Sequence, residues 1–183
     1  AVGLLSHEEL ELAYAICRTL RDGLPADTRI LIDVHARFTE VAALQAANRF
    51  ADLGIYWWEE PTSRDRQETV HWGADRSPIP VATGEMYDTV GQFYALAAGG
   101  GVNIFQPEPM SLGGIGPSMQ VANLARAHGS YIAPHQSGGP IPGGPVLVVA
   151  NHPNSLLDPL VIFRVAGRPT RPLAKAPLFE QRF

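Results

Sequence analysis

The sequence predicts an α/β fold, in which about five consecutive strand–helix units form part of a (β/α)₈ barrel. Predicted strands and helices alternate five times, with a step of about 25 residues. Such a repeat implies parallel strands joined by right-handed crossover connections. No glycine-rich phosphate loop follows the first predicted strand, which favours a barrel over a doubly wound sheet. A complete barrel takes about 250 residues. The 183 residues here therefore predict a partial one.

Three carboxylates recur at one spacing along this repeat. Asp33, Glu59 and Glu85 are 26 residues apart, and each follows an apolar run typical of a buried strand. In a parallel sheet the carboxyl ends of the strands share one face. One such residue alone is more often a helix cap or a solvated loop residue. Three at equal spacing indicate a site for a hard cation such as Mg²⁺.

The elements follow in order along the chain. Ser6 and Glu9 form the sequence of a capping box, which opens the first helix. Predicted helices cover about 6–23, 39–54, 63–75, 88–99 and 113–125, and predicted strands cover 30–34, 54–58, 79–82, 102–105 and 131–133. A further apolar run at 146–150 also predicts a strand, and after it the alternation of strands and helices stops. The regular repeat therefore ends near residue 141.

Composition narrows the class of function. The net charge is −4 and no basic stripe is present, which argues against a nucleic-acid partner. The one cysteine, Cys17, cannot form a disulfide within the chain, which fits a reducing cytoplasm. No apolar run is long enough to span a membrane, so we expect no membrane partner for the barrel part. Composition therefore predicts a cytoplasmic protein without a nucleic-acid partner.

Two histidines and a fourth carboxylate also stand at predicted strand ends. His35 lies two residues after Asp33, so an extended backbone places both side chains on the same side. His135 follows the strand at 131–133, and Glu108 ends the strand before it. A carboxylate at that position can accept a hydrogen bond from one ring nitrogen of His135 and orient the ring as a base. The sequence therefore predicts a hydrogen bond between Glu108 and His135.

Five motifs stand at the predicted strand ends: Ile-Asp-Val-His at 32–35, Trp-Glu-Glu-Pro at 58–61, Thr-Gly-Glu at 83–85, Gln-Pro-Glu at 106–108 with Gly-Gly-Ile at 113–115, and Ala-Pro-His at 133–135. Together they resemble the motifs of the enolase superfamily, in its mandelate racemase subgroup. Their order and spacing both match, over about residues 1–141. The Asp-x-His pair at 33–35 is similar to that of the sugar-acid dehydratases, of which galactonate dehydratase is one kind.

The resemblance implies a mechanism and a ligand set. Asp33, Glu59 and Glu85 would hold Mg²⁺, His135 would take the α-proton of a sugar acid, and His35 would protonate the departing β-hydroxyl. The product would be a 2-keto-3-deoxy acid. Full-length relatives are expected to form homo-oligomers. The family usually has Asp at the position of Glu108, so one extra methylene has to be accommodated there.

The remaining residues, 142–183, resemble the start of a glycerolipid acyltransferase of the lysophosphatidate type. In that interpretation His152 would be the base and Asp158 would orient it, although an Asn-His-Pro turn explains the same letters. Near-duplicate Gly-Gly-Pro triplets at 138–140 and 143–145 flank the change. They suggest two partial genes joined at a short repeat. Three hypotheses stay open: a sugar-acid dehydratase or a fragment of one, a glycerolipid acyltransferase, and an inactive chimeric fragment. For the barrel part, dehydration and epimerisation or racemisation stay open too.

Overall fold

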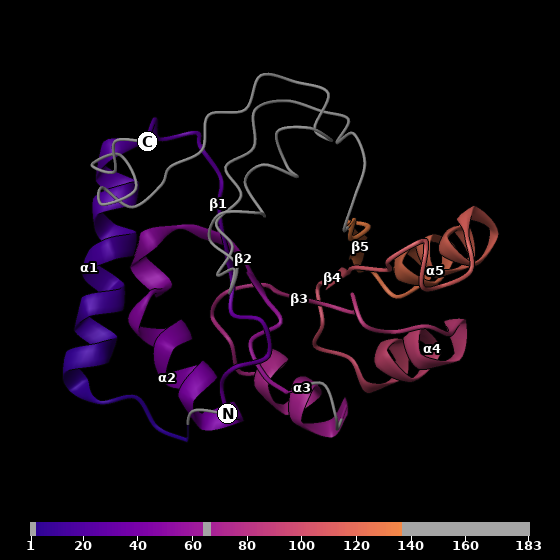
Figure 1. Cartoon of the computed structure of the whole chain (residues 1–183), viewed down its shortest axis with the longest axis horizontal. Coiled ribbons are helices and arrows are strands. Elements are labelled where there is room, and N and C mark those ends of the chain that lie inside the picture. Colours follow the sequence, from indigo (N-terminus) through magenta and orange to yellow (C-terminus); the bar gives the residue numbers. More distant parts are fainter. Residues whose placement is uncertain (1–2, 64–66, 137–183) are drawn as a thin grey trace, which may run out of the picture. The chain divides into compact units, whose positions relative to one another are not determined.

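A five-stranded parallel sheet lies at the centre of the fold (Figure 1). The structure is a computed structural model that describes residues 3–63 and 67–136. The strands are β1 (Ile30–Asp33), β2 (Ile55–Glu59), β3 (Val81–Thr83), β4 (Ile104–Phe105) and β5 (Tyr131–Ile132). Each strand pairs in parallel with the next in the order β1-β2-β3-β4-β5. The predicted α/β class and parallel sheet are confirmed.

Helices connect the strands and cover their outer side. They are α1 (His7–Gly23), α2 (Glu40–Arg49), α3 (Gln67–Ala74), α4 (Val90–Gly99) and α5 (Ile115–Ala127), with a short 3-10 helix η1 (Ala51–Leu53) before β2. Each helix packs against the next one in sequence. Figure 1 shows them as an arc around the strands, from α1 in indigo to α5 in orange. Sequential parallel strands inside an arc of helices are the arrangement of a (β/α)₈ barrel.

Local sequence explains where the helices begin. The Ser6 hydroxyl accepts from the backbone N–H of Glu9, and the Glu9 carboxylate accepts from the backbone N–H of Ser6, so the predicted capping box is confirmed. Thr89 and Gln92 form a second capping box at α4. Such caps satisfy backbone donors that a first helical turn leaves without intrahelical partners. The cap at α4 also fixes where that helix leaves the loop that follows β3.

The apolar side chains form two clusters, one at each end of the described sheet. The first joins α1, α2 and η1 to β1 and β2, and its centre is Trp58, packed edge-to-face on Phe50 with ring centroids 5.7 Å apart. The second joins α3, α4 and α5 to β3 and β4 around the fully buried Phe93. Burying an aromatic side chain of this size contributes about 1.5–3 kcal/mol. These clusters hold the strand ends in place.

Several strands are shorter than the sequence predicted. The expected strand at 79–82 begins at Val81, because Pro80 has no N–H to donate to a ladder. The expected strand at 102–105 begins at Ile104, because the Asn103 side chain accepts from the Val81 N–H at 2.9 Å, where a backbone carbonyl would extend the ladder. The predicted strand at 146–150 and the predicted segment 142–183 lie outside the described residues.

Within the described ranges, no helix combines the length and the apolar character needed to cross a membrane.

Candidate active site at the carboxyl ends of the strands

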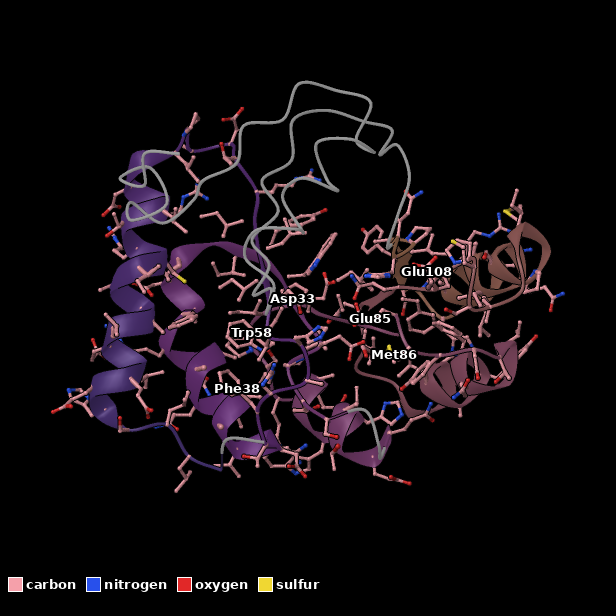
Figure 2. All side chains as sticks on the ribbon, viewed as in Figure 1. Asp33, Phe38, Trp58, Glu85, Met86 and Glu108 are labelled. Carbon is pink, nitrogen blue, oxygen red and sulfur yellow. The ribbon has the colours of Figure 1, made fainter. Side chains whose placement is uncertain are left out.

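The predicted site residues of the barrel part stand at or just beyond the carboxyl ends of strands. Asp33 and Glu59 are register partners at the ends of β1 and β2. Glu85 comes two residues after β3, Glu108 three residues after β4, and His135 three residues after β5. Figure 2 shows Asp33, Glu85 and Glu108 in succession across the middle of the fold. Each of these residues therefore ends or closely follows a strand, as the sequence predicted.

The turn after β3 brings Glu85 into the group. Gly84 has φ +121°, a conformation that residues with a side chain rarely adopt. A Cβ atom on Gly84 would lie 2.7 Å from Cε1 of Phe93, so the position also lacks room for a side chain. The turn leaves the Glu85 carboxylate buried, with only 7% of the residue exposed. Glycine at position 84 is thus what allows Glu85 to reach the site.

His135 bridges two of the carboxylates. Its Nδ1 lies 2.9 Å from Oε2 of Glu108, and its Nε2 lies 3.1 Å from Oε2 of Glu85. The other Glu108 oxygen, Oε1, accepts from the backbone N–H of Met110 at 3.2 Å. The predicted hydrogen bond between Glu108 and His135 is confirmed, so the longer Glu side chain reaches the ring. One ring nitrogen is oriented by Glu108, and the other faces Glu85.

His35 approaches the other oxygen of Glu85. Its backbone N–H donates to Oδ1 of Asp33 at 2.8 Å, and its Nδ1 lies 3.8 Å from Oε1 of Glu85 and 4.0 Å from Oδ2 of Asp33. Its φ of +55° turns the chain sharply at this point. About half of the side chain, 54%, is exposed. The two histidines therefore approach the two different oxygens of one carboxylate.

Burial dominates the electrostatics of the site, and like charges act in the same direction. Desolvation by burial raises the pKa of Asp33, repulsion by Glu85 adds to it, and the hydrogen bond from the His35 backbone opposes it. Desolvation also raises the pKa of Glu59, and repulsion by Asp33 and by Glu85 acts in the same direction. The three predicted metal ligands thus repel one another in a poorly solvated place. Such a group of carboxylates is stabilised by an added cation.

Two residues near Glu59 were not predicted as site residues. The indole N–H of Trp57 donates to Oε2 of Glu59 at 3.0 Å, and a hydrogen bond from the Gln106 side chain also lowers the pKa of Glu59. For Trp57 the sequence predicted only a place in the strand at 54–58. Its position two residues before Glu59, on the same face of a strand, was the signal that could have identified it. Gln106 is the first residue of the motif at 106–108, and nothing else in the sequence indicates that its side chain contacts Glu59.

The types of donor atom at this site suit a divalent cation, but their positions in this structure do not form a site that could hold one. The oxygens of Asp33, Glu59 and Glu85 are hard ligands, and Oε1 of Gln106 is buried with no hydrogen-bond partner among the described residues. Within residues 3–63 and 67–136, however, no group of three or more His, Cys, Asp and Glu side chains could hold a metal ion. The histidine rings contact the Glu85 oxygens in this arrangement. The metal triad stays a prediction.

The acyltransferase pair, His152 and Asp158, lies outside the described residues. The sequence matches the family described as "Enolase C-terminal domain-like" over residues 4–159. That match extends through both residues, and the comparisons with known proteins give no support to an acyltransferase. The predicted boundary between residues 141 and 142 falls inside the match and stays a prediction.

Known proteins of similar sequence are enzymes of sugar-acid chemistry. The chain is 33% identical to the D-galactarolactone cycloisomerase of Agrobacterium fabrum, covering 73% of this chain and 34% of that enzyme. It is 31% identical to the D-gluconate dehydratase of Thermoproteus tenax, covering 75% of this chain and 28% of that enzyme. The chain thus spans about a third of the length of these curated relatives.

Solved structures agree with the sequence comparisons. A member of the enolase superfamily from Salmonella Typhimurium superimposes with a TM-score of 0.72 at 27% identity, over 75% of this chain and 35% of that one. A mandelate racemase/muconate lactonizing protein from Paracoccus denitrificans, complexed with magnesium, gives a TM-score of 0.65 at 33% identity, over 69% of this chain and 34% of that one. With the parallel sheet and the strand-end carboxylates, these matches show that the chain belongs to the enolase C-terminal domain-like family.

Proposed function

We propose that this chain carries the metal-binding and proton-transferring part of a Mg²⁺-dependent sugar-acid dehydratase. The observation that carries the proposal is the arrangement of two histidines on the two oxygens of Glu85, with Glu108 orienting His135. Dehydration of a hydroxy acid needs a base for the α-proton and an acid for the β-hydroxyl. Two imidazoles beside the two oxygens of one carboxylate can supply these two groups.

The residues divide the work as follows. The Glu108 carboxylate fixes the His135 ring through Nδ1, and Nε2, which contacts Glu85 in this structure, would accept the α-proton of the substrate in place of that contact. The electrons of the broken C–H bond form a C=C bond as the β-hydroxyl leaves. His35 gives that hydroxyl a proton, so water departs and the enol product tautomerises to a 2-keto-3-deoxy acid. Positioned acid–base groups of this kind contribute about 10²–10⁴-fold to a rate.

Asp33, Glu59 and Glu85 would hold the cation. When bound, Mg²⁺ would make the α-proton more acidic by drawing charge toward the substrate carboxylate. The raised pKa values of Asp33 and Glu59 support the assignment, because they show carboxylates gathered at a cost in repulsion and desolvation. The magnesium complex of the Paracoccus denitrificans relative supports it as well.

A second candidate is cycloisomerisation of a sugar-acid lactone, favoured by the 33% identity to the D-galactarolactone cycloisomerase. It needs proton transfer at the same site, but it does not release water. His35 distinguishes the two, because only dehydration expels a hydroxyl group that requires an acid.

The test incubates the 183-residue chain with Mg²⁺ and a panel of aldonates, aldarates and aldarolactones. We expect a 2-keto-3-deoxy acid from at least one aldonate, detected by semicarbazone absorbance and mass spectrometry, and none after treatment with EDTA. Loss of water in the product mass identifies dehydration, and conversion of a lactone at unchanged mass identifies cycloisomerisation. If no substrate changes, then the chain by itself is inactive and the proposal is wrong for this chain.

A further inference from the structure

The Glu60 carboxylate lies beside the site but is neither a proposed ligand nor a proposed acid or base. Only 1% of the residue is exposed. Its Oε1 accepts from the Thr83 hydroxyl and from the backbone N–H of Gly84, both at 2.9 Å. These two donors directly precede Glu85 in the chain. A carboxylate from the end of β2 therefore holds the turn that follows β3.

The backbone of Glu60 connects the same strand ends. Its N–H donates to the carbonyl of Ala82 in β3 at 2.9 Å, and its carbonyl accepts from the N–H of Ala36 at 2.7 Å. Ala36 follows His35 in the loop after β1. One residue thus contacts both the loop that carries Asp33 and His35 and the turn that carries Glu85.

Glu60 also has an uncommon backbone conformation. Among the described residues other than glycine, positive φ occurs at His35, Ala36 and Glu60, with values of +55°, +57° and +42°. This region is disfavoured for residues with a side chain, and it persists where the surroundings hold it. All three residues belong to the strand ends that form the site. Their grouping there indicates that the fold maintains this geometry for the site.

We propose that Glu60 is a positioning residue that places the Glu85 carboxylate. Its two side-chain hydrogen bonds fix the Gly84 turn from one side, while Phe93 closes the turn from the other side. With the turn fixed, Oε2 of Glu85 lies 3.1 Å from Nε2 of His135. The catalytic consequence rests on the proposed function. The placement of the turn itself does not.

The first measurement follows the Gly84 amide directly, in the full chain. Hydrogen exchange by NMR compares the wild type with Glu60→Gln, which keeps an acceptor oxygen, and with Glu60→Leu, which removes both. Glu68→Leu, at an exposed position on α3, is the matched control. In Glu60→Leu we expect Gly84 to exchange at least about tenfold faster relative to amides inside α4, as loss of a buried hydrogen bond predicts. Glu60→Gln and Glu68→Leu should leave that ratio near the wild-type value.

The second measurement uses Mn²⁺ as a probe, titrated by calorimetry. Loss of a residue that orients a metal ligand typically weakens metal binding about 10- to 100-fold, and we expect this of Glu60→Leu. Thr83→Val, which removes one donor to Glu60, should fall between Glu60→Leu and the wild type. Glu60→Gln should restore binding to within about threefold, since the acceptor oxygen is kept. A merely structural role would lower the free energy of unfolding without a matching loss of Mn²⁺ affinity.

The outcomes separate this inference from the proposed function. If Glu60→Leu leaves the Gly84 exchange ratio unchanged, Glu60 does not hold the turn and the inference is overturned. If the turn loosens but Mn²⁺ binds as in the wild type, Glu60 does not position Glu85, which also overturns it. If the wild type itself binds no Mn²⁺, the proposed metal site fails, while the Gly84 result still decides whether Glu60 holds the turn.

Discussion

At the scale of single residues, the pair formed by Glu108 and His135 determines which ring nitrogen is available. Glu108→Gln keeps an oxygen near Nδ1 of His135 but removes the negative charge that holds the ring. We expect kcat to fall about 10- to 100-fold, as for other partners that orient a functional histidine, with little change in KM. The measurement is steady-state keto-acid formation, with Glu68→Gln as the control. An unchanged kcat would remove Glu108 from the mechanism.

The sequence predicted contacts between single residues correctly where the ends of neighbouring strands are enough to bring the side chains together. The contact of Glu108 with His135 was predictable, because both follow neighbouring strands of a parallel repeat. The bonds of Glu60 to Thr83 and Gly84 were not predictable. Successive side chains of a strand point to opposite faces, so alternation predicts only that Glu60 points away from Glu59. The positive φ that turns its carboxylate toward the β3–α4 connection depends on tertiary contacts.

At the scale of elements, the turn between β3 and α4 depends on glycine. Gly84→Ala would force a side chain into φ +121° and against Phe93. We expect the free energy of unfolding to fall by about 1–3 kcal/mol. Gly91→Ala is the matched control, because Gly91 is exposed near the start of α4 and its Cβ would meet only Oγ1 of Thr89, at 3.9 Å.

Alanine favours a helix over glycine, so Gly91→Ala should be neutral or stabilising by up to about 1 kcal/mol. Chemical denaturation of the two variants and the wild type gives the comparison. Equal stability of Gly84→Ala and the wild type would show that the turn can move away from Phe93, which contradicts the prediction.

Cys17 in helix α1 should make the free energy of unfolding depend on pH. Cys17 packs against the cluster of α1, α2, β1 and β2, and burial raises the pKa of its thiol. Below the unfolded pKa of about 8.5 the thiol is neutral in both states and its contribution to stability is fully present. As the pH rises through this value, the unfolded chain ionises first, so stability is lost until the folded pKa is passed.

The free energy of unfolding should therefore fall more steeply between pH 8 and pH 10 for the wild type than for Cys17→Ala. Denaturant titrations at several pH values measure it. Parallel curves for the two proteins would mean that the thiol ionises equally in the folded and unfolded states.

At the scale of the whole molecule, the regular repeat was sufficient to predict a parallel sheet with its strands in sequential order. Periodicity predicts strand order well because each unit has to bury the same apolar faces. It could not place the two apolar clusters, since these depend on which aromatic side chains meet, such as Trp58 with Phe50. The enolase resemblance is confirmed by the match over residues 4–159, and the acyltransferase resemblance is not supported.

The proposed metal site would connect these two clusters. Asp33 and Glu59 end strands that belong to the first cluster, and Glu85 follows a strand that belongs to the second. A cation shared by the three carboxylates would relieve their repulsion and couple the two halves of the sheet. Binding to the folded state at 100 times the dissociation constant adds about 2.7 kcal/mol to the free energy of unfolding. For a chain of this size the expected rise in Tm is about 5–11 °C.

Scanning calorimetry of the full chain with and without Mg²⁺ measures this rise, and Na⁺ at the same ionic strength controls for general screening of charge. Glu85→Gln should abolish most of the rise, because it removes the ligand that belongs to the second cluster. Glu68→Gln should keep it, because that residue is exposed on α3. A rise of equal size in Na⁺ would indicate screening alone. A rise that survives Glu85→Gln would place the cation elsewhere than between these strands.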